Sequence, residues 1–267
     1  CPGTALVSKT MLHKWEEPAL AGSGGSGAVF FGGCTLKCKY CQNAAISGVP
    51  VGKAMDSAAL RSAMEDLIAQ GAENIDLVTP TQFLPTIIPA LTPKLPVPVV
   101  YNCGGYERAE TIARLDGLVD IYLPDMKYAD NALATTLSGA KDYFQVAASA
   151  IKEMVRQVGP VQWQGEKVTR GVIIRHLILP GHVENSLKVL DWIGENFAPG
   201  EVLVSLMSQY TPCYKALEMP PLHRRISSFE YNDVVQHALE LGLDTGYMQQ
   251  RSSAKEEYTP PFDLSGV

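Results

Sequence analysis

Three of the chain's six cysteines, Cys34, Cys38 and Cys41, lie close together in the stretch GGCTLKCKYCQN, residues 32–43. Six cysteines in a chain of 267 residues do not make a dense disulfide framework. Neighbours such as Cys38 and Cys41 could pair only across a strained turn. Thiolates at such tight spacing are typical metal ligands of a reduced protein. The spacing therefore predicts a metal site, and the number of thiols limits which metal it holds.

A structural zinc ion takes four closed ligands, usually as two separated pairs. The chain has no second CxxC, so a four-thiolate zinc site would need Cys103 or Cys213 as well. A redox-active pair of Cys38 and Cys41 is another alternative, but it would not need Cys34. An iron–sulfur cube held by three thiolates keeps one iron open for a further ligand. The cube is the interpretation that we favour.

Apolar runs and amphipathic stretches alternate about six times along the chain. The apolar runs are nearly continuous, as expected for strands buried on both faces. The alternation predicts a parallel α/β protein, and both a doubly wound sheet and a partial or full barrel fit it. The predicted strands are 27–33, 74–79, 97–102, 118–125, 171–179 and 201–208, and the predicted helices are 56–71, 83–91, a segment from near 106, 141–158, 185–197 and 227–242.

Polar residues collect where the predicted strands end, which is where parallel α/β proteins bind ligands. Arg175 and His176 lie inside the fifth strand, so one of the two side chains must point inward. The alternatives are a core histidine for His176 and ordinary turns for the others. The residues expected at this edge are Cys34, Thr79, Thr81, Asn102, Asp125 and Lys127.

The spacing Cys34-x3-Cys38-x2-Cys41, with Tyr40 before the last cysteine, resembles the radical S-adenosylmethionine (SAM) superfamily. The resemblance implies that the three cysteines bind a 4Fe-4S cluster and that SAM binds the fourth iron through its amino and carboxylate groups. In that superfamily the reduced cluster passes one electron to the sulfonium, and a 5′-deoxyadenosyl radical forms. Such a radical abstracts hydrogen from its surroundings, so a dry, closed cavity is expected.

Within this superfamily, four stretches of the chain are similar to the pyruvate formate-lyase activating enzyme group. The resemblance implies a partial (β/α)6 barrel of the TIM type. The segments HKWEEP and VYNCGGYE look like a less characterised branch related to the activases. The four stretches are GSGAVFFGGC (25–34), CKYCQN (38–43), YLPDMK (122–127) and IRHLILPG (174–181).

The same resemblance implies contacts to SAM. Tyr40 and Gln42 would border SAM through their backbone. The strand end from Asp125 to Lys127 would hold the ribose and carboxylate side, and His176 would lie near the ribose or adenine.

One motif departs from the family. Its usual Gly-Gly-Glu after the second strand, which binds the SAM amino group, is here Thr-Pro-Thr. Thr79 and Thr81 are therefore expected to offer oxygen atoms to this group. Asn102 is a further candidate for SAM binding.

Composition narrows the class of protein. The chain is 46% hydrophobic with a formal net charge of −6 and no long basic run, which disfavours duplex nucleic acid as a partner. No stretch is long and apolar enough for a membrane span, and no signal peptide is recognisable, so we expect a cytoplasmic protein. Because the chain begins with Cys1, we expect upstream residues to be missing. The predicted organisation is a lead-in (1–26), a radical SAM barrel (27–245) and a C-terminal extension (246–267).

Several residues have open roles. Trp15, Glu16 and Glu17 could roof the cavity or cover the open edge of the barrel. Tyr210 and Lys215 could meet substrate. We expect Cys103 and Cys213 to be buried small hydrophobic residues, with hydrogen donation to a substrate radical as an alternative.

The predicted function is reductive cleavage of SAM and hydrogen abstraction from a small-molecule or undefined substrate. One alternative is an activating enzyme that installs a glycyl radical on a partner protein. Another is a non-catalytic zinc-binding α/β module. The family resemblance implies a low-potential flavodoxin or ferredoxin as the electron donor.

Overall fold

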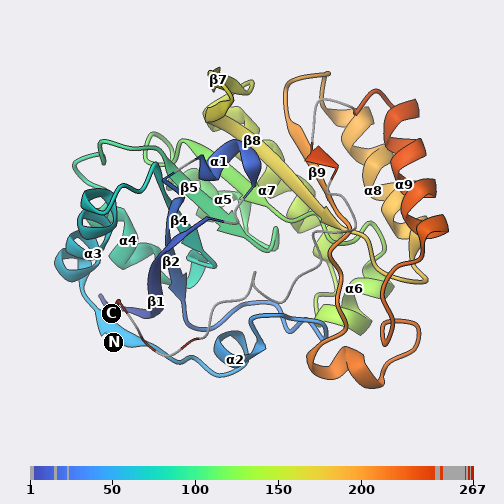
Figure 1. The fold of residues 1–267 in the computed structure, drawn as a ribbon, viewed down its shortest axis with the longest axis horizontal. Helices are drawn as coiled ribbons and strands as arrows, with labels where there is room; N and C mark the ends of the chain where they lie inside the picture. The colour runs from blue at the N-terminus through green and yellow to red at the C-terminus, as the bar shows by residue number, and fades with distance from the viewer. Residues whose placement is uncertain are drawn as a thin grey trace.

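Six parallel strands lie side by side in sequence order and form the centre of the sheet (Figure 1). Helices follow these strands, and the sheet curves without closing, so the predicted partial (β/α)6 barrel is confirmed. The computed structural model describes residues 3–14, 17–22, 24–243, 247–248, 262, 264 and 266–267. The parallel strands are β2 (Ser26–Phe31), β4 (Asn74–Val78), β5 (Val99–Cys103), β6 (Ile121–Pro124), β8 (Lys167–Leu177) and β9 (Leu203–Met207).

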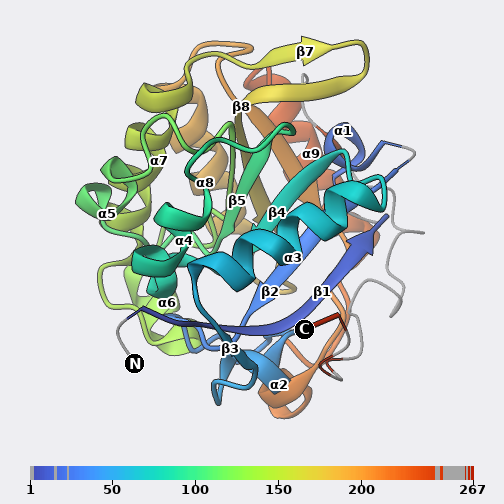
Figure 2. The ribbon, with the colours of Figure 1, turned by 90° about the vertical axis from the view of Figure 1, so that its left-hand side faces the viewer.

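Helices cover the outer side of the sheet, and Figure 2 shows α3 lying across β2 and β4. The stripe predicted for 141–158 is buried in α7, where Ile151 and Met154 are fully enclosed. A capping box starts α9, since Ser227 and Glu230 each bond the other's backbone N–H. The helices of this layer are α3 (Ser57–Ala69), α4 (Leu84–Ala90), α5 (Ala109–Ala113), α6 (Asn131–Ser138), α7 (Tyr143–Val158), α8 (Val183–Asn196) and α9 (Ser228–Glu240).

The lead-in contains a strand that the sequence analysis missed. This strand, β1 (Ala5–His13), pairs antiparallel with β2 and with the short β3 (Lys53–Met55). On the opposite edge of the sheet, β10 (Tyr247–Met248) pairs with β9, and β7 (Gln162–Gln164) forms a hairpin with β8. Much of the predicted lead-in, residues 5–13, is therefore part of the sheet.

The two faces of the parallel strands have different partners because successive side chains point to opposite faces. Outward residues such as Tyr122 and Ile174 belong to the main core with the helices. Inward residues such as Leu123, Ile173 and Leu203 form a separate apolar cluster inside the barrel. The residues that follow them toward the carboxyl ends are polar, and these carry the candidate site.

The amino ends of the strands are closed by the short helix α1 (Pro18–Ala21). Ala19 and Leu20 join the interior cluster, and the Leu20 carbonyl accepts a hydrogen bond from Asn74 Nδ2 at 2.7 Å. Glu17 is buried, and its carboxylate accepts from Ser205 Oγ at 3.0 Å, so Glu17 does not roof the cavity. Trp15 and Glu16 lie outside the described residues. Within the described part, no helix has the length and apolar character to cross a bilayer.

Candidate functional site

The loop that carries the three cysteines is fixed by backbone hydrogen bonds on both sides. The N–H groups of Lys37 and Lys39 donate to the carbonyls of Ser138 (3.0 Å) and Leu137 (2.8 Å) at the end of α6. From the other side, the N–H of Ala216 in the 3₁₀ helix η2 (Tyr214–Glu218) donates to the Lys39 carbonyl at 3.0 Å. These bonds fix the direction in which the thiols between them point.

The chain leaves β2 through Gly33, whose φ of 87° favours glycine. Gln82 stabilises this turn because its Nε2 donates to the carbonyls of Gly32 (3.3 Å), Gly33 (3.0 Å) and Thr79 (3.0 Å). The ends of β2 and β4 are thereby joined, and Cys34 is placed directly above the barrel interior.

A cavity of about 270 Å³ opens at the carboxyl ends of the strands. It brings together nearly all of the predicted site residues, which come from four separate segments of the chain. Those that line it are Cys34, Cys38, Tyr40, Cys41, Gln42, Thr79, Asn102, Asp125 and Lys127.

The three clustered thiols are half-buried, and none of them forms a disulfide. Burial raises the pKa of Cys34 to about 11 and raises the pKa of Cys38, whereas the nearby Lys127 ammonium lowers both. Bound metal would therefore be needed to hold them as thiolates.

The residues present fit a 4Fe-4S cluster. Three free thiols line one cavity, next to a buried cation that offsets thiolate charge. Among the described residues, no three His, Cys, Asp or Glu side chains converge closely enough to hold a single metal ion. A four-iron cube is larger than one ion, so its three thiolates need not converge on one point. Cys34, Cys38 and Cys41 are the residues that would hold it.

A buried charge network forms the wall beside the thiols. Arg175 Nε donates to Asp125 Oδ1 at 2.9 Å, and its Nη2 donates to Asn102 Oδ1 at 2.7 Å. Lys127 Nζ pairs with the other Asp125 oxygen. Burial opposes ionisation of Asp125, but Arg175 and Lys127 together keep its pKa below the ordinary value. Asp125 in turn raises the pKa of Lys127 despite its burial. The wall therefore carries fixed charges of both signs.

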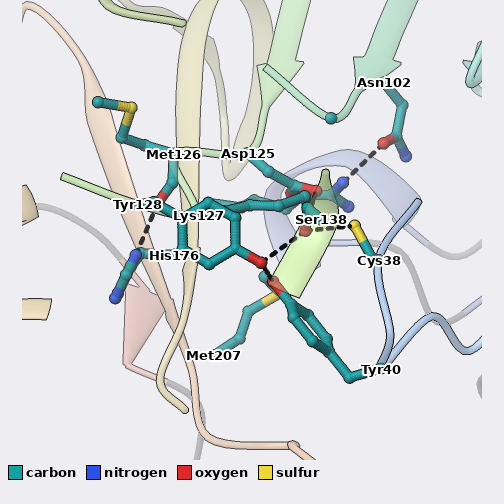
Figure 3. A network of polar contacts seen from close by, with 12 residues as sticks. Cys38, Tyr40, Asn102, Asp125, Met126, Lys127, Tyr128, Ser138, His176 and Met207 are labelled. Carbon is teal, nitrogen blue, oxygen red and sulfur yellow. Dashed lines mark hydrogen bonds and ion pairs between the residues drawn. The ribbon is translucent and has the colours of Figure 1, made fainter. Parts of the chain in front are cut away.

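The structure places Arg175, and not His176, at the cavity. His176 is fully buried on the helix-facing side, where Nδ1 lies 2.7 Å from the Met126 carbonyl and Nε2 lies 2.8 Å from Ser186 Oγ (Figure 3). Burial lowers the pKa of His176 to about 4, so the ring is neutral at pH 7. This geometry matches the core-histidine alternative. Strand alternation required one of the two to face inward but did not identify which.

The two threonines of the Thr-Pro-Thr motif are separated. Thr79 lines the cavity with an unusual φ of 59°, and its N–H donates to the Asn102 carbonyl at 2.8 Å. Thr81 is not among the lining residues. Its Oγ1 lies 2.8 Å from Tyr101 Oη and donates to Glu107 Oε1 at 3.2 Å. Thr79 is therefore the threonine that can reach a ligand in this cavity.

Two residues with open roles also line the cavity, namely Cys103 and Tyr210, whereas Lys215 does not. Cys103 is almost fully buried, and burial, together with the nearby Glu107 carboxyl, raises the pKa of its thiol. Tyr210 donates from Oη to the Leu222 carbonyl at 2.7 Å, so its ring and not its hydroxyl faces Tyr40.

Comparison with known proteins agrees with this geometry. The model of the family described as 4Fe-4S single cluster domain matches residues 20–82, which include all three clustered cysteines. The fold is similar to that of Streptococcus suis SuiB bound to precursor peptide SuiA, with a TM-score of 0.55 and 13% identity over 82% of this chain. It is also similar to methylornithine synthase (PylB), with a TM-score of 0.53 and 14% identity over 79% of this chain.

The chain spans 47% of SuiB and 62% of methylornithine synthase, so these likenesses show a shared fold and not a shared activity. The cluster-domain match and the cysteine-lined cavity define a candidate iron–sulfur protein with this fold. The chain belongs to the same family as Uncharacterized protein MJ0674 of Methanocaldococcus jannaschii. The two are 32% identical over 253 residues, which cover 91% of this chain and 70% of the relative.

Proposed function

We propose that the protein binds a 4Fe-4S cluster and SAM in the cavity and abstracts hydrogen from a substrate bound beside them. The observation that carries this proposal is the convergence of three free thiols and a charged strand end on one enclosed space. The cluster, when bound, would supply the electron that cleaves SAM. The protein's own residues would bind SAM and the substrate, orient them, and exclude water from the cavity.

The wall beside the thiols suits a zwitterionic ligand. The Lys127 ammonium and the Arg175 guanidinium favour a carboxylate, while Asp125 accepts hydrogen bonds from hydroxyl or ammonium groups. Thr79 lines the same cavity, so its oxygen atoms are available to accept hydrogen bonds from an amino group. These features support the predicted SAM contacts from Thr79, Asp125 and Lys127, with Tyr40, Gln42 and Asn102 beside them.

A small-molecule substrate fits the cavity better than a protein loop. The Phe262 ring packs against the Phe30 ring, with centroids 5.6 Å apart. Phe30 also lines the cavity. This contact adds apolar surface beside the cavity. A glycyl-radical partner, as for the pyruvate formate-lyase activating enzyme group, is the alternative, because an unclosed sheet can admit an extended peptide.

Anaerobic reconstitution with iron and sulfide tests the proposal. We expect a brown protein with about four irons per chain that converts SAM to 5′-deoxyadenosine and methionine under dithionite. Cys34→Ala, Cys38→Ala and Cys41→Ala should each lose both iron and activity.

Cys213→Ala is the matched control, because this half-buried thiol lies next to the loop and donates only to the Tyr40 carbonyl at 3.4 Å. It should keep full iron content. A colourless protein that holds one zinc, and loses it in Cys213→Ala, would instead identify the zinc-binding module.

A further inference from the structure

A chain of buried hydroxyl groups ends on one of the three cluster thiols (Figure 3). Tyr40 Oη lies 2.6 Å from Tyr128 Oη, which lies 2.6 Å from Ser138 Oγ. Ser138 Oγ lies 3.0 Å from Cys38 Sγ. All three hydroxyl residues are buried, and the chain has no solvent-exposed member. We call Tyr40, Tyr128 and Ser138 the hydroxyl relay.

The number of available protons fixes the donor-to-acceptor direction of each hydrogen bond in the relay. A hydroxyl has one proton to donate, and Ser138 donates it to Cys38 Sγ. Tyr128 must then donate to Ser138, and Tyr40 must donate to Tyr128. Each bond therefore points toward the sulfur, and each polarises the next.

The fold positions the relay from three separate elements. Tyr40 lies inside the cysteine loop, Tyr128 follows β6, and Ser138 is the last residue of α6. Ser138 is fixed a second time because its carbonyl accepts from Lys37 N–H at 3.0 Å. The Ser138 hydroxyl thus contacts the Cys38 thiol, and the Ser138 carbonyl holds the backbone of the cysteine loop.

We propose that the hydroxyl relay donates a hydrogen bond to the Cys38 sulfur of the bound cluster and thereby raises the cluster's reduction potential. This inference rests on the proposed function. Reduction adds negative charge that is shared by the thiolate sulfurs, so a fixed donor stabilises the reduced cluster more than the oxidised one. Ser138, Tyr128 and Tyr40 are positioning residues in this scheme, because they act through Cys38.

The relay also gives Cys38 a different hydrogen-bond environment from that of the other two thiols. Cys41 has a longer contact, with Ser47 Oγ at 3.3 Å, at a partly exposed site. Ser47 is partly exposed, so water competes with it for Cys41, whereas Ser138 is 2% exposed and its hydroxyl already bonds Tyr128. The strongest donor effect is therefore expected at the Cys38 corner.

A redox titration followed by electron paramagnetic resonance tests the proposal on reconstituted full-length protein. At a fixed potential, Ser138→Ala should lower the ratio of reduced to oxidised cluster about tenfold. For one electron, this corresponds to a reduction potential that is about 59 mV lower. Tyr128→Phe should lower it less, because Ser138 keeps its proton but loses its polarising donor. Tyr122→Phe is the control, since its buried hydroxyl donates to Gln157 on the opposite face of the sheet.

Equal potentials in wild type and Ser138→Ala would overturn the relay alone. Wild-type protein that takes up no iron would contradict the proposed function instead.

Discussion

Glu107 is a buried carboxyl group directly behind the cavity wall. Oε1 accepts from Thr81 at 3.2 Å, while Oε2 is buried and has no hydrogen-bond partner among the described residues. Burial raises the pKa of Glu107 from 4.5 to about 7. Its side chain is therefore partly protonated at neutral pH, next to the Cys103 thiol.

This raised pKa predicts a pH dependence of stability. As the pH rises past 4.5, the unfolded chain releases the proton while the folded chain retains it up to about pH 7. Glu107 therefore contributes stability below pH 4.5, and this contribution of about 3 kcal/mol is lost as the pH rises to about 7. Urea unfolding of wild type and Glu107→Gln between pH 4 and 8 measures the effect.

The difference between the two proteins isolates Glu107, because every other titrating group is common to both. His176, whose pKa is lowered by burial, acts in the opposite direction over an overlapping pH range in both proteins. A difference that stays constant across this range would show that Glu107 ionises as in the unfolded chain.

At the residue scale, the sequence predicted those cavity residues whose positions follow from the cysteine spacing or from the ends of the predicted strands. The three cysteines, Asp125 and Lys127 were found in this way and line one cavity. Arg175 could not be chosen over its neighbour His176, because alternation along a strand leaves the inward residue undetermined until the register is known. The relay partner Ser138 carries no sequence signal, since its contact with Cys38 joins residues 100 positions apart.

At the scale of elements, the end of β4 is the strained point of the sheet. Thr79 adopts a φ of 59°, which a β-branched residue rarely occupies. Such a conformation costs on the order of 1–3 kcal/mol and is kept where function requires it.

Thr79→Gly is expected to raise the free energy of unfolding by about 1 kcal/mol, because glycine adopts this φ without strain but loses more entropy on folding. Thermal and urea unfolding measure the change. Thr135→Gly in α6 is the control and should be destabilising, since that threonine has helical geometry. A destabilised Thr79→Gly variant would show that side-chain contacts of Thr79 outweigh its backbone strain.

Strand and helix alternation was correctly predicted for all six parallel strands because they are nearly continuous apolar runs. The strand β1 was missed for the opposite reason. It contains the buried polar residues Ser8, Lys9 and Thr10, whose burial depends on partners far along the chain. Ser8, for example, donates to the Val51 carbonyl at 2.5 Å. Pairing with distant segments determines this strand, so the local sequence pattern could not predict it.

At the scale of the whole molecule, charge is unevenly distributed. The net charge is −6, yet no Asp or Glu occurs between Pro18 and Met55, a range that holds the cysteine loop and three lysines. Beside this loop, η2 adds Lys215 and the exposed Tyr214 and Leu217. We call Lys37, Lys39, Lys215, Tyr214 and Leu217 the lysine face. It supports the proposal that an acidic flavodoxin or ferredoxin delivers electrons here.

The double variant Lys37→Glu/Lys39→Glu should slow cluster reduction by a low-potential flavodoxin at least tenfold at low ionic strength, because complementary charge mainly sets association rates. Stopped-flow absorbance measures this rate. The extent of reduction by excess dithionite should be unchanged.

Lys152→Glu/Lys188→Glu is the matched control, because these lysines lie on the outer helices α7 and α8. It should keep the wild-type rate. Equal slowing by both double variants would mean that overall net charge, and not the lysine face, governs the encounter.

Ala19 and Leu20 fill the barrel interior at the amino ends of the strands, so we expect both SAM and the substrate to enter at the carboxyl ends, where the cavity lies. If SAM binds nearer the cysteine loop than the substrate does, SAM has to bind first and its fragments have to leave last. Steady-state inhibition patterns would then show ordered binding, and release of the outer product would limit turnover whenever that product is tightly bound.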